Sequence, residues 1–376
     1  MLTPEFCIAI LSMTSAQRCL NVIWRRQGVL GKIGGLLLTP AAWGFSALVG
    51  GRNWLYNQRW LTVQHPPVTV ISVGNLTVGG TGKTPVVLWL AHKLTVRGYK
   101  VGILNRGYQG AQAHITVVGT NGHPTVTPEE VGDEAVMLAR LFPGVVIAGR
   151  NRAAGAHLAQ EQFGLDIVIL DDGFQHRRLN RAVDLLLLNA RQGLQECRLL
   201  PAGPFREPFS AARRADIVIV TKGDAQANQL LLPHEWGKLS PQKPIYGGSL
   251  QPTALVSSEQ RQWRELPLAY LSGKRIAALA GIADPTPFYQ SLRDWDAEVV
   301  EVMEFPDHHQ YSQADWQTIS ARGQKVDLIV TTEKDLVKLE RFPFATGKLV
   351  ALRVRMAIDR EEHLLADIER RLTKAA

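Results

Sequence analysis

The chain has 376 residues, of which 45% are apolar and 20% are charged. This length and composition exclude a wholly disordered chain and allow two domains that each bury a core. The formal charge of +8 favours an anionic partner such as a phosphate or an acidic lipid; nucleic acid is disfavoured, because the basic residues are scattered and lack a stacking platform or reading motif.

The amino end is apolar between residues 29 and 51, a span close to that of a bilayer core, but Lys32, Pro40 and several glycines interrupt it. Basic and aromatic residues flank the stretch, as they do in segments that lie at a membrane interface. We therefore expect membrane-associated helices over residues 1–65. Helices packed on the protein's own core, or a true span, remain alternatives. A removable signal peptide is disfavoured, and Met13 is as plausible a start as Met1.

A strand, a glycine-rich loop and a helix are predicted next. Residues 68–74 form a β-branched run, the glycine-rich segment follows, and residues 85–98 have apolar residues at helical spacing and end on Gly98. Further short apolar runs alternate with segments such as 151–163. These runs cover 100–104, 145–149, 166–170, 183–188 and 215–220. The alternation predicts an α/β fold, a parallel sheet covered by helices on both faces, over residues 66–240.

The sheet pattern lapses into polar, proline-containing sequence, so we expect a linker at 241–270. A second, smaller α/β domain is predicted for 271–376. Its strands are expected at 275–281, 297–302, 326–332 and 348–354, and its helices at 287–295, 313–322 and 361–372. The three cysteines, Cys7, Cys19 and Cys197, lack the spacing of a zinc or redox site, which indicates a reducing compartment and no structural metal.

The segment "VGNLTVGGTGKTP" (73–85) differs from the usual phosphate-binding loop, G-x-x-x-x-G-K-[ST], because Thr77 stands at the first glycine position. A phosphate cradle needs backbone N–H groups curled around oxygens, a lysine, a hydroxyl for magnesium and a helix amino end. The residues that supply these are Gly79, Gly80, Thr81, Gly82, Lys83 and Thr84. Gly74, at the strand exit, is expected to take over part of the turning role. The segment is interpreted as a P-loop.

Acidic residues follow two other apolar segments. "VILDDGFQHRRL" (168–179) ends a strand in Asp171 and Asp172; because neighbouring strand residues point to opposite faces, we expect one to reach magnesium and the other to fix the loop. "EEVGDEAVMLARLF" (129–142) places Asp133 and Glu134 at a helix start, where the helix dipole alone favours carboxylates.

These motifs, with "NRGYQG", "LPAGPFRE", "FPDHH" and "TTEKD", occur in one order that resembles the tetraacyldisaccharide 4′-kinase family. The resemblance covers roughly residues 29–355. It implies a P-loop NTPase-type kinase of lipid A biosynthesis that uses ATP and Mg²⁺ to phosphorylate the 4′-hydroxyl of a lipid disaccharide 1-phosphate. It also implies a peripheral enzyme on the cytoplasmic face of the bacterial inner membrane; no obligate protein partner is evident. The family's loop likewise has a non-glycine residue where Thr77 stands.

The resemblance implies a role for individual residues. Asp133 matches the catalytic aspartate that accepts the proton of the sugar hydroxyl, and His308, in preference to His309, matches the histidine that orients it. The metal-binding positions match Thr84, Glu134, Asp171 and Asp172. The lipid-substrate positions match Arg106, Tyr108, His176, Arg206 and Glu207. Gln109 departs from the glycine common in the family.

Two alternative functions remain at this point. "TKGD" (221–224) resembles the guanine-reading [NT]-K-x-D motif, with Asp224 placed to hold a purine amino group, which would fit a GTPase. A non-catalytic, nucleotide-dependent membrane adaptor would need the loop but neither Asp133 nor His308. A comparison of phosphoryl transfer from ATP and from GTP tests the GTPase alternative. The ordered acidic motifs disfavour the adaptor.

Overall fold

The structure is a computed structural model that describes residues 22–24, 26 and 28–375, apart from 108–113, 191–196, 222–242, 260–261 and 345–346. The chain forms two compact units. The first, here called the P-loop unit, runs to Leu250 and resumes at Met356; the second, the inserted unit, is Gln251–Arg355. The chain leaves the P-loop unit within strand β9 (Ile245–Glu259) and returns within β14 (Leu349–Ile358).

The sheet of the P-loop unit has the strand order β9-β8-β7-β1-β6-β2-β5-β3-β4. All pairings from β9 to β5 are parallel, and β3 and β4 add an antiparallel edge. The strands are β1 (Thr69–Asn75), β2 (Val101–Asn105), β3 (Thr116–Thr120), β4 (His123–Pro124), β5 (Val145–Ala148), β6 (Ile167–Asp171), β7 (Val183–Asn189) and β8 (Ile217–Thr221). The strands expected from the apolar runs are present.

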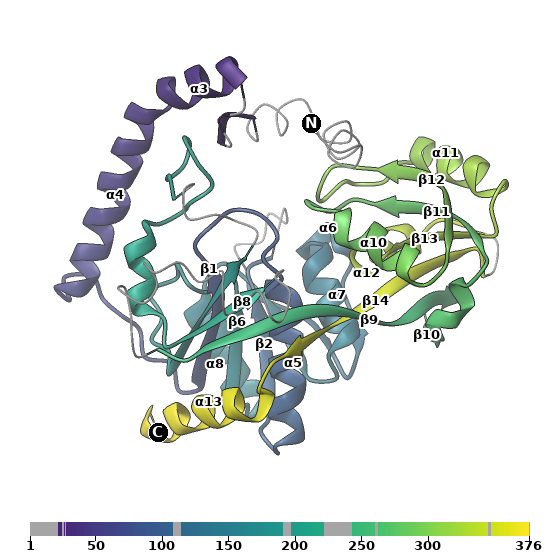
Figure 1. Cartoon of the computed structure of the whole chain (residues 1–376). Helices are drawn as coiled ribbons and strands as arrows, with labels where there is room; N and C mark the ends of the chain where they lie inside the picture. Colours follow the sequence, from purple (N-terminus) through teal and green to yellow (C-terminus); the bar gives the residue numbers. More distant parts are fainter. Residues whose placement is uncertain are drawn as a thin grey trace. The chain divides into compact units, whose positions relative to one another are not determined.

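Helices cover the sheet because its central strands are apolar on both faces (Figure 1). Helix α8 (Arg152–Phe163) packs through Ala153, Ala156 and Ala159 on the face that carries Leu104 and Leu170. The other helices of this layer structure are α5 (Lys83–Val96), α6 (Pro128–Val131), α7 (Asp133–Leu141), the 3-10 helix η2 (Phe209–Arg214) and α13 (Glu361–Ala375). Because the strands from β9 to β5 are parallel, their carboxyl ends lie at one edge of the sheet, which is where ligands bind in such folds.

Two amino-terminal helices, α3 (Gly28–Leu37) and α4 (Thr39–Asn57), precede the sheet, and Pro40 falls in the first turn of α4. No single described helix is both long and apolar enough to cross a membrane. Taken together, α3 and α4 satisfy that test of length and composition, with a bend of 47° between them. In Figure 1, α4 stands outside the helices that cover the sheet.

The inserted unit is built on parallel strands in the order β12-β11-β13-β14, continued by the part of β9 that lies in this unit, on which β10 pairs antiparallel. Its further elements are η4 (Leu268–Leu271), β10 (Gln262–Leu266), β11 (Arg275–Ala280), α10 (Thr286–Asp294), β12 (Glu298–Glu304), α11 (Gln313–Gly323), β13 (Leu328–Thr332) and α12 (Glu333–Leu339). Buried side chains on both sides of β11, such as Ile276 and Leu279, form two core clusters.

Two expectations about the second domain are corrected. The expected linker at 241–270 contains the long strand β9 and its partner β10. The helix expected at 361–372 is α13, which belongs to the P-loop unit. Its Glu361 accepts a hydrogen bond from Trp89 at 3.0 Å, and its Asp367 accepts one from Tyr246 at 2.7 Å. These tertiary contacts, rather than sequence adjacency, determine where the helix packs.

Candidate functional site

The segment after β1 forms the loop expected of a phosphate cradle. Gly79 and Gly82 have φ values of 104° and 80°, a region that disfavours side chains, and a Cβ on Gly79 would meet no atom within 4 Å. Gly80 has no such φ, so only two of the three expected glycines are required by backbone conformation. Helix α5 begins at Lys83, with Thr84 as its second residue, so its first N–H groups adjoin the loop.

Gly74 has a different role from the one expected. It is still part of β1, and a Cβ there would lie 2.6 Å from both the backbone nitrogen and the Cβ of Phe174. The glycine thus allows the loop after β6 to pack against β1, instead of turning the chain. The amide of the next residue, Asn75, donates to the Thr81 hydroxyl at 2.8 Å and its Oδ1 accepts from Lys83 at 3.3 Å.

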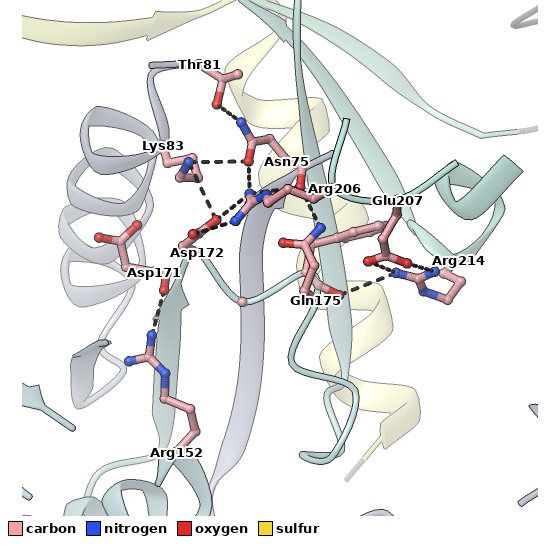
Figure 2. Close-up of polar contacts among 12 residues, drawn as sticks. Asn75, Thr81, Lys83, Arg152, Asp171, Asp172, Gln175, Arg206, Glu207 and Arg214 are labelled. Atoms are coloured by element: carbon pink, nitrogen blue, oxygen red, sulfur yellow. Dashed lines mark hydrogen bonds and ion pairs between the residues drawn. The ribbon is translucent and has the colours of Figure 1, made fainter. Parts of the chain in front are cut away.

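Asp172 holds two cations beside the loop (Figure 2). Both terminal nitrogens of Arg206 donate to its carboxylate at 2.8 Å, and Lys83 Nζ lies 3.5 Å from Oδ1. Although burial opposes the charge, hydrogen bonds from Arg206 and the charge of Lys83 lower the pKa of Asp172 to about 2. Asp172 also has a φ of 54°, which turns the chain out of β6. The two residues "DD" therefore have different partners, but the left-handed turn at Asp172, and not the alternation of a continuing strand, separates them.

Asp171 is the last residue of β6 and its side chain is buried. Its Oδ2 accepts from Asn105 at 2.9 Å; within the described chain, Oδ1 is buried and lacks a hydrogen-bond partner. Burial, reinforced by the charges of Glu134 and Asp172, raises the pKa of Asp171 to about 7. Arg152 is buried beneath it and donates to the Asp171 main-chain oxygen at 3.1 Å (Figure 2).

The raised pKa of Asp171 predicts that this residue lowers the free energy of unfolding as pH rises. The unfolded Asp171 ionises near pH 4 and the folded one near pH 7, so its contribution to stability is present below about pH 4 and is lost as pH rises to about 7. Asp171→Asn removes the ionisation. Thermal unfolding without nucleotide or metal should show the variant gaining Tm over wild type progressively from pH 4 to pH 7, with a constant gain above. A difference in Tm between variant and wild type that does not change with pH would contradict a raised pKa for the buried Asp171 carboxyl.

The motif "VGDE" begins α7 close to these aspartates. Asp133 is buried at 3% exposure and its Oδ1 accepts from the Glu134 backbone at 2.9 Å. Glu134 is close enough to Asp171 to raise the pKa of that carboxyl. The Arg106 segment adjoins this helix start, because a Cβ on Gly107 would lie 3.6 Å from the Val131 carbonyl. Arg106 itself is exposed, and Tyr108 and Gln109 lie outside the described residues.

The remaining residues expected to bind substrate have different surroundings. His176 is half-buried among arginines; burial and the charge of Arg152 lower its pKa to about 4, so the ring is neutral at pH 7. Glu207 is buried and forms a bidentate ion pair with Arg214 at 2.9 and 3.0 Å, and it also accepts from Asn53 of α4 at 2.7 Å. These contacts make Glu207 a link between η2, which carries Arg214, and α4, which carries Asn53 (Figure 2 shows the pair with Arg214).

The two histidines of "PDHH" lie in the inserted unit and differ in their contacts. The ring of His309 packs at a tilt against Phe305, with centroids 4.8 Å apart, and its Nε2 lies 3.1 Å from Asp315, which forms a capping box with Ser312 at the start of α11. His308 has a φ of 60° and its Nε2 lies 3.2 Å from Lys334 Nζ. His309 is thus held in the packing of its own unit, whereas His308 is the histidine in a strained turn, a feature common at functional sites.

Sequence reasoning missed three buried polar residues at this edge. Asn75 ends β1, Asn105 ends β2, and Arg152 begins α8. Asn75 and Asn105 carry a signal that was available, since each is a polar residue at the carboxyl end of an apolar strand. Arg152 carries none, because its guanidinium is buried only through contacts with the Leu104 and Asp171 carbonyls.

The donor set fits a magnesium ion bound with a nucleotide. No group of three His, Cys, Asp or Glu side chains that could hold a metal occurs in the described residues. Mg²⁺ in kinases is held by one or two carboxylates and by phosphate oxygens, so a full protein cage is not required. The orphaned Oδ1 of Asp171 is an oxygen ligand of the kind needed.

Comparisons with known proteins agree on one family. The family model "Tetraacyldisaccharide-1-P 4'-kinase" matches residues 35–373. The tetraacyldisaccharide 4'-kinase of Syntrophus aciditrophicus is 42% identical over 300 residues, 77% of this chain and 80% of that protein. A relative of the same name from Anaeromyxobacter dehalogenans is 37% identical over 359 residues, 93% of each chain. The crystal structure of LpxK from Aquifex aeolicus in complex with ATP is similar, with a TM-score of 0.74 at 34% identity, covering 90% of this chain and 99% of that one.

The family match extends over both units and includes the P-loop, the acidic motifs and the "PDHH" turn. The chain belongs to the tetraacyldisaccharide-1-P 4'-kinase family.

Proposed function

We propose that the protein is an ATP- and Mg²⁺-dependent kinase that phosphorylates the 4′-hydroxyl of a tetraacylated glucosamine disaccharide 1-phosphate. The observation that carries this proposal is one cluster at the carboxyl edge of the sheet, in which the P-loop, Lys83 and Asp172 lie together with Asp171, near the α7 start that carries Asp133 and Glu134. The family membership supplies the substrate class.

The P-loop residues are proposed to bind the nucleotide phosphates. Backbone N–H groups at residues 79–84 donate to phosphate oxygens, and Lys83 adds positive charge to them. Asp172 and Asn75 fix the Lys83 ammonium before the nucleotide binds. Because phosphoryl transfer depends mainly on positioning and charge neutralisation, a pre-set lysine lowers the reorganisation needed in the reaction.

Asp133 is proposed to accept the proton of the sugar hydroxyl. The hydroxyl oxygen forms a bond to the γ-phosphorus, the bond from that phosphorus to the bridging oxygen of ADP breaks, and the proton passes to the Asp133 carboxylate. His308 is proposed to orient this carboxylate, as the family resemblance implies.

Mg²⁺, when bound with the nucleotide, neutralises phosphate charge. Asp171, Glu134 and the Thr84 hydroxyl are proposed to hold it. Asp172, already paired with Lys83 and Arg206, is assigned to fixing the loop instead. Arg206 and Arg106, with the neutral His176, are proposed to face the lipid substrate. Its 1-phosphate suits the fork of the exposed Arg106, since the fork of Arg206 already donates to Asp172.

The amino-terminal helices are proposed to hold the enzyme on the cytoplasmic face of the bacterial inner membrane. Nine of the sixteen most exposed large apolar side chains in the described chain fall between Val29 and Trp60. A cluster of this kind favours a membrane surface over water. Helix α4 also binds the kinase core, through Arg52, which donates to the Gln175 carbonyl at 2.6 Å, and through Asn53, which donates to Glu207 at 2.7 Å.

Polar substitutions on this apolar surface should release the protein from membranes. We expect Leu30→Ser combined with Leu37→Ser and Leu48→Ser to lower binding to anionic phospholipid vesicles by at least about tenfold, since burying each leucine contributes roughly 1.5 to 3 kcal/mol. The measurement is cosedimentation. Val96→Ser is the matched control, because Val96 is equally exposed, at 86%, but lies on α5. Unchanged binding of the triple variant would place the anchor elsewhere.

The function is tested by incubating the protein with γ-labelled ATP, Mg²⁺ and the disaccharide 1-phosphate, and by following label in the lipid. A labelled bis-phosphate is the expected product. Parallel reactions with γ-labelled GTP test the alternative raised by "TKGD", of which Lys222–Asp224 lie outside the described residues. Release of free phosphate from GTP without lipid labelling would favour a GTPase.

A further inference from the structure

Thr81 of the phosphate-binding loop is held by hydrogen bonds on two sides. Its hydroxyl accepts from the Asn75 amide at 2.8 Å (Figure 2), and its main-chain carbonyl accepts from the Thr221 hydroxyl, also at 2.8 Å. Asn75 ends β1 and Thr221 ends β8, so both donors lie at the carboxyl edge of the sheet. Thr81 and Thr221 are buried, at 4% and 2% exposure, so little water competes for the contact between them.

Thr221 is also the first residue of "TKGD", a motif to which the proposed kinase activity gives no role. Its backbone is fixed by parallel pairing on both sides, opposite Asn189 of β7 and Gly248 of β9. The hydroxyl has one proton to donate, and its oxygen lies 2.8 Å from the Thr81 carbonyl against 3.2 Å from the Leu188 carbonyl. The shorter distance favours donation to Thr81, so the end of β8 binds the phosphate loop.

The direction of the Thr81 carbonyl sets the direction of the next N–H group. The peptide bond between Thr81 and Gly82 is planar and trans, so its C=O and its N–H point in opposite directions. Because the carbonyl points to Thr221, the Gly82 N–H points away from the end of β8. Gly82, with a φ of 80°, has no side chain that would restrict this peptide. The hydrogen bond from Thr221 therefore supplies a restraint that the glycine itself does not.

We propose that Thr221 is a positioning residue that fixes the Thr81–Gly82 peptide, so that the Gly82 N–H faces the nucleotide phosphates before ATP binds. The proposal rests on the proposed function, in which N–H groups at residues 79–84 bind those phosphates. A donor that is already oriented needs no reorganisation when the phosphate arrives. The first residue of "TKGD" then acts on the phosphates through the loop, and this role does not depend on which base the nucleotide carries.

The hydrogen bond can be measured without any nucleotide. The sequence contains two Thr–Gly pairs, at 81–82 and 346–347, so carbonyl-¹³C threonine combined with ¹⁵N glycine gives two signals in a ¹³C–¹⁵N correlation of the full-length protein in detergent. Thr346→Ser removes the second signal and assigns the first. Thr221→Val should move the Thr81 carbonyl carbon upfield, because a carbonyl that loses a hydrogen bond is less deshielded. Thr221→Ser, which keeps the hydroxyl, should largely restore the wild-type shift.

Equilibrium binding then tests the positioning role. Thr221→Val should lower the affinity for ATP by roughly 3- to 10-fold, the factor that one buried hydrogen bond usually contributes, with recovery in Thr221→Ser. The affinity for adenosine, which has no phosphate, should stay as in wild type. Thr331→Val is the matched control, because Thr331 is fully buried near the end of β13 and its hydroxyl lacks a hydrogen-bond partner within the described residues; it should change neither affinity.

Two results would overturn the proposal. One is a Thr81 carbonyl shift that Thr221→Val leaves unchanged, and the other is a Thr221→Val protein that loses affinity for ATP and for adenosine equally, or for neither. The failure of the proposed function has a different signature. A wild-type protein that binds no ATP would contradict that function, while the carbonyl shift would still report on the contact between Thr221 and Thr81.

Discussion

Asp133→Asn is expected to lower turnover by between about 10²- and about 10⁴-fold, the contribution of a positioned general base. The affinity for ATP should stay close to that of wild type, because the P-loop contacts with phosphate do not involve Asp133. Asparagine keeps an oxygen that can accept from the Glu134 N–H, so the start of α7 is retained. Single-turnover transfer, with nucleotide affinity measured separately by equilibrium binding, separates the two quantities.

Glu130→Gln is the control for this substitution. Glu130 is a carboxylate at the start of the adjacent helix α6, where it completes a capping box with Thr127. We expect it to change stability slightly and turnover hardly at all, since its role is to cap a helix. An Asp133→Asn enzyme that loses ATP affinity as much as turnover would show that Asp133 supports the nucleotide site and is not the base.

Asp172→Asn should lower kcat/KM for ATP by on the order of 10²-fold, because Asp172 fixes Lys83, and the loss of one electrostatic contact to the reacting phosphate usually costs about that much. Lys83 and Arg206 share the Asp172 carboxylate, so loss of its charge leaves two cations close together with weaker restraint. Asparagine tolerates the left-handed φ of 54° at this position, so the backbone turn after β6 is preserved. Initial rates at varied ATP provide the measurement.

A magnesium titration distinguishes the two neighbouring aspartates. Asp171→Asn should raise the Mg²⁺ concentration needed for half-maximal rate, whereas Asp172→Asn should leave it nearly unchanged. Asp166→Asn, an exposed carboxylate at the other end of the same strand that accepts from the Lys100 backbone, is the matched control. If Asp172→Asn alone raised the magnesium requirement, the roles assigned to the pair would be reversed.

Much of the P-loop unit could be predicted because its signals are local. The runs that became β2, β6 and β8 are apolar up to a polar last residue, so their composition and length identify buried parallel strands. The phosphate loop is equally local, since its conformation depends on glycines at 79 and 82 between a strand and a helix. The cluster of acidic motifs followed from topology, because parallel strands end at the same edge.

The remaining features depend on partners that are distant in the sequence. β9 contains Gly247, Gly248 and Pro252, which disfavour a strand locally, yet its pairing with β8 and β10 overrides that preference. Gly74 was given a turning role because the approach of Phe174 cannot be inferred from sequence. The ion pair of Glu207 with Arg214 and its link to α4 were hidden for the same reason.

The most direct test of the account locates the new phosphate on the lipid product. Wild-type protein, ATP and Mg²⁺ are incubated with the tetraacylated disaccharide 1-phosphate, and the product is analysed by two-dimensional ³¹P–¹H NMR. We predict a phosphomonoester coupled to the sugar proton at position 4′, formed by wild type and nearly absent with Asp133→Asn. A phosphate on another hydroxyl, or consumption of ATP without any new lipid ester, would contradict the proposed kinase.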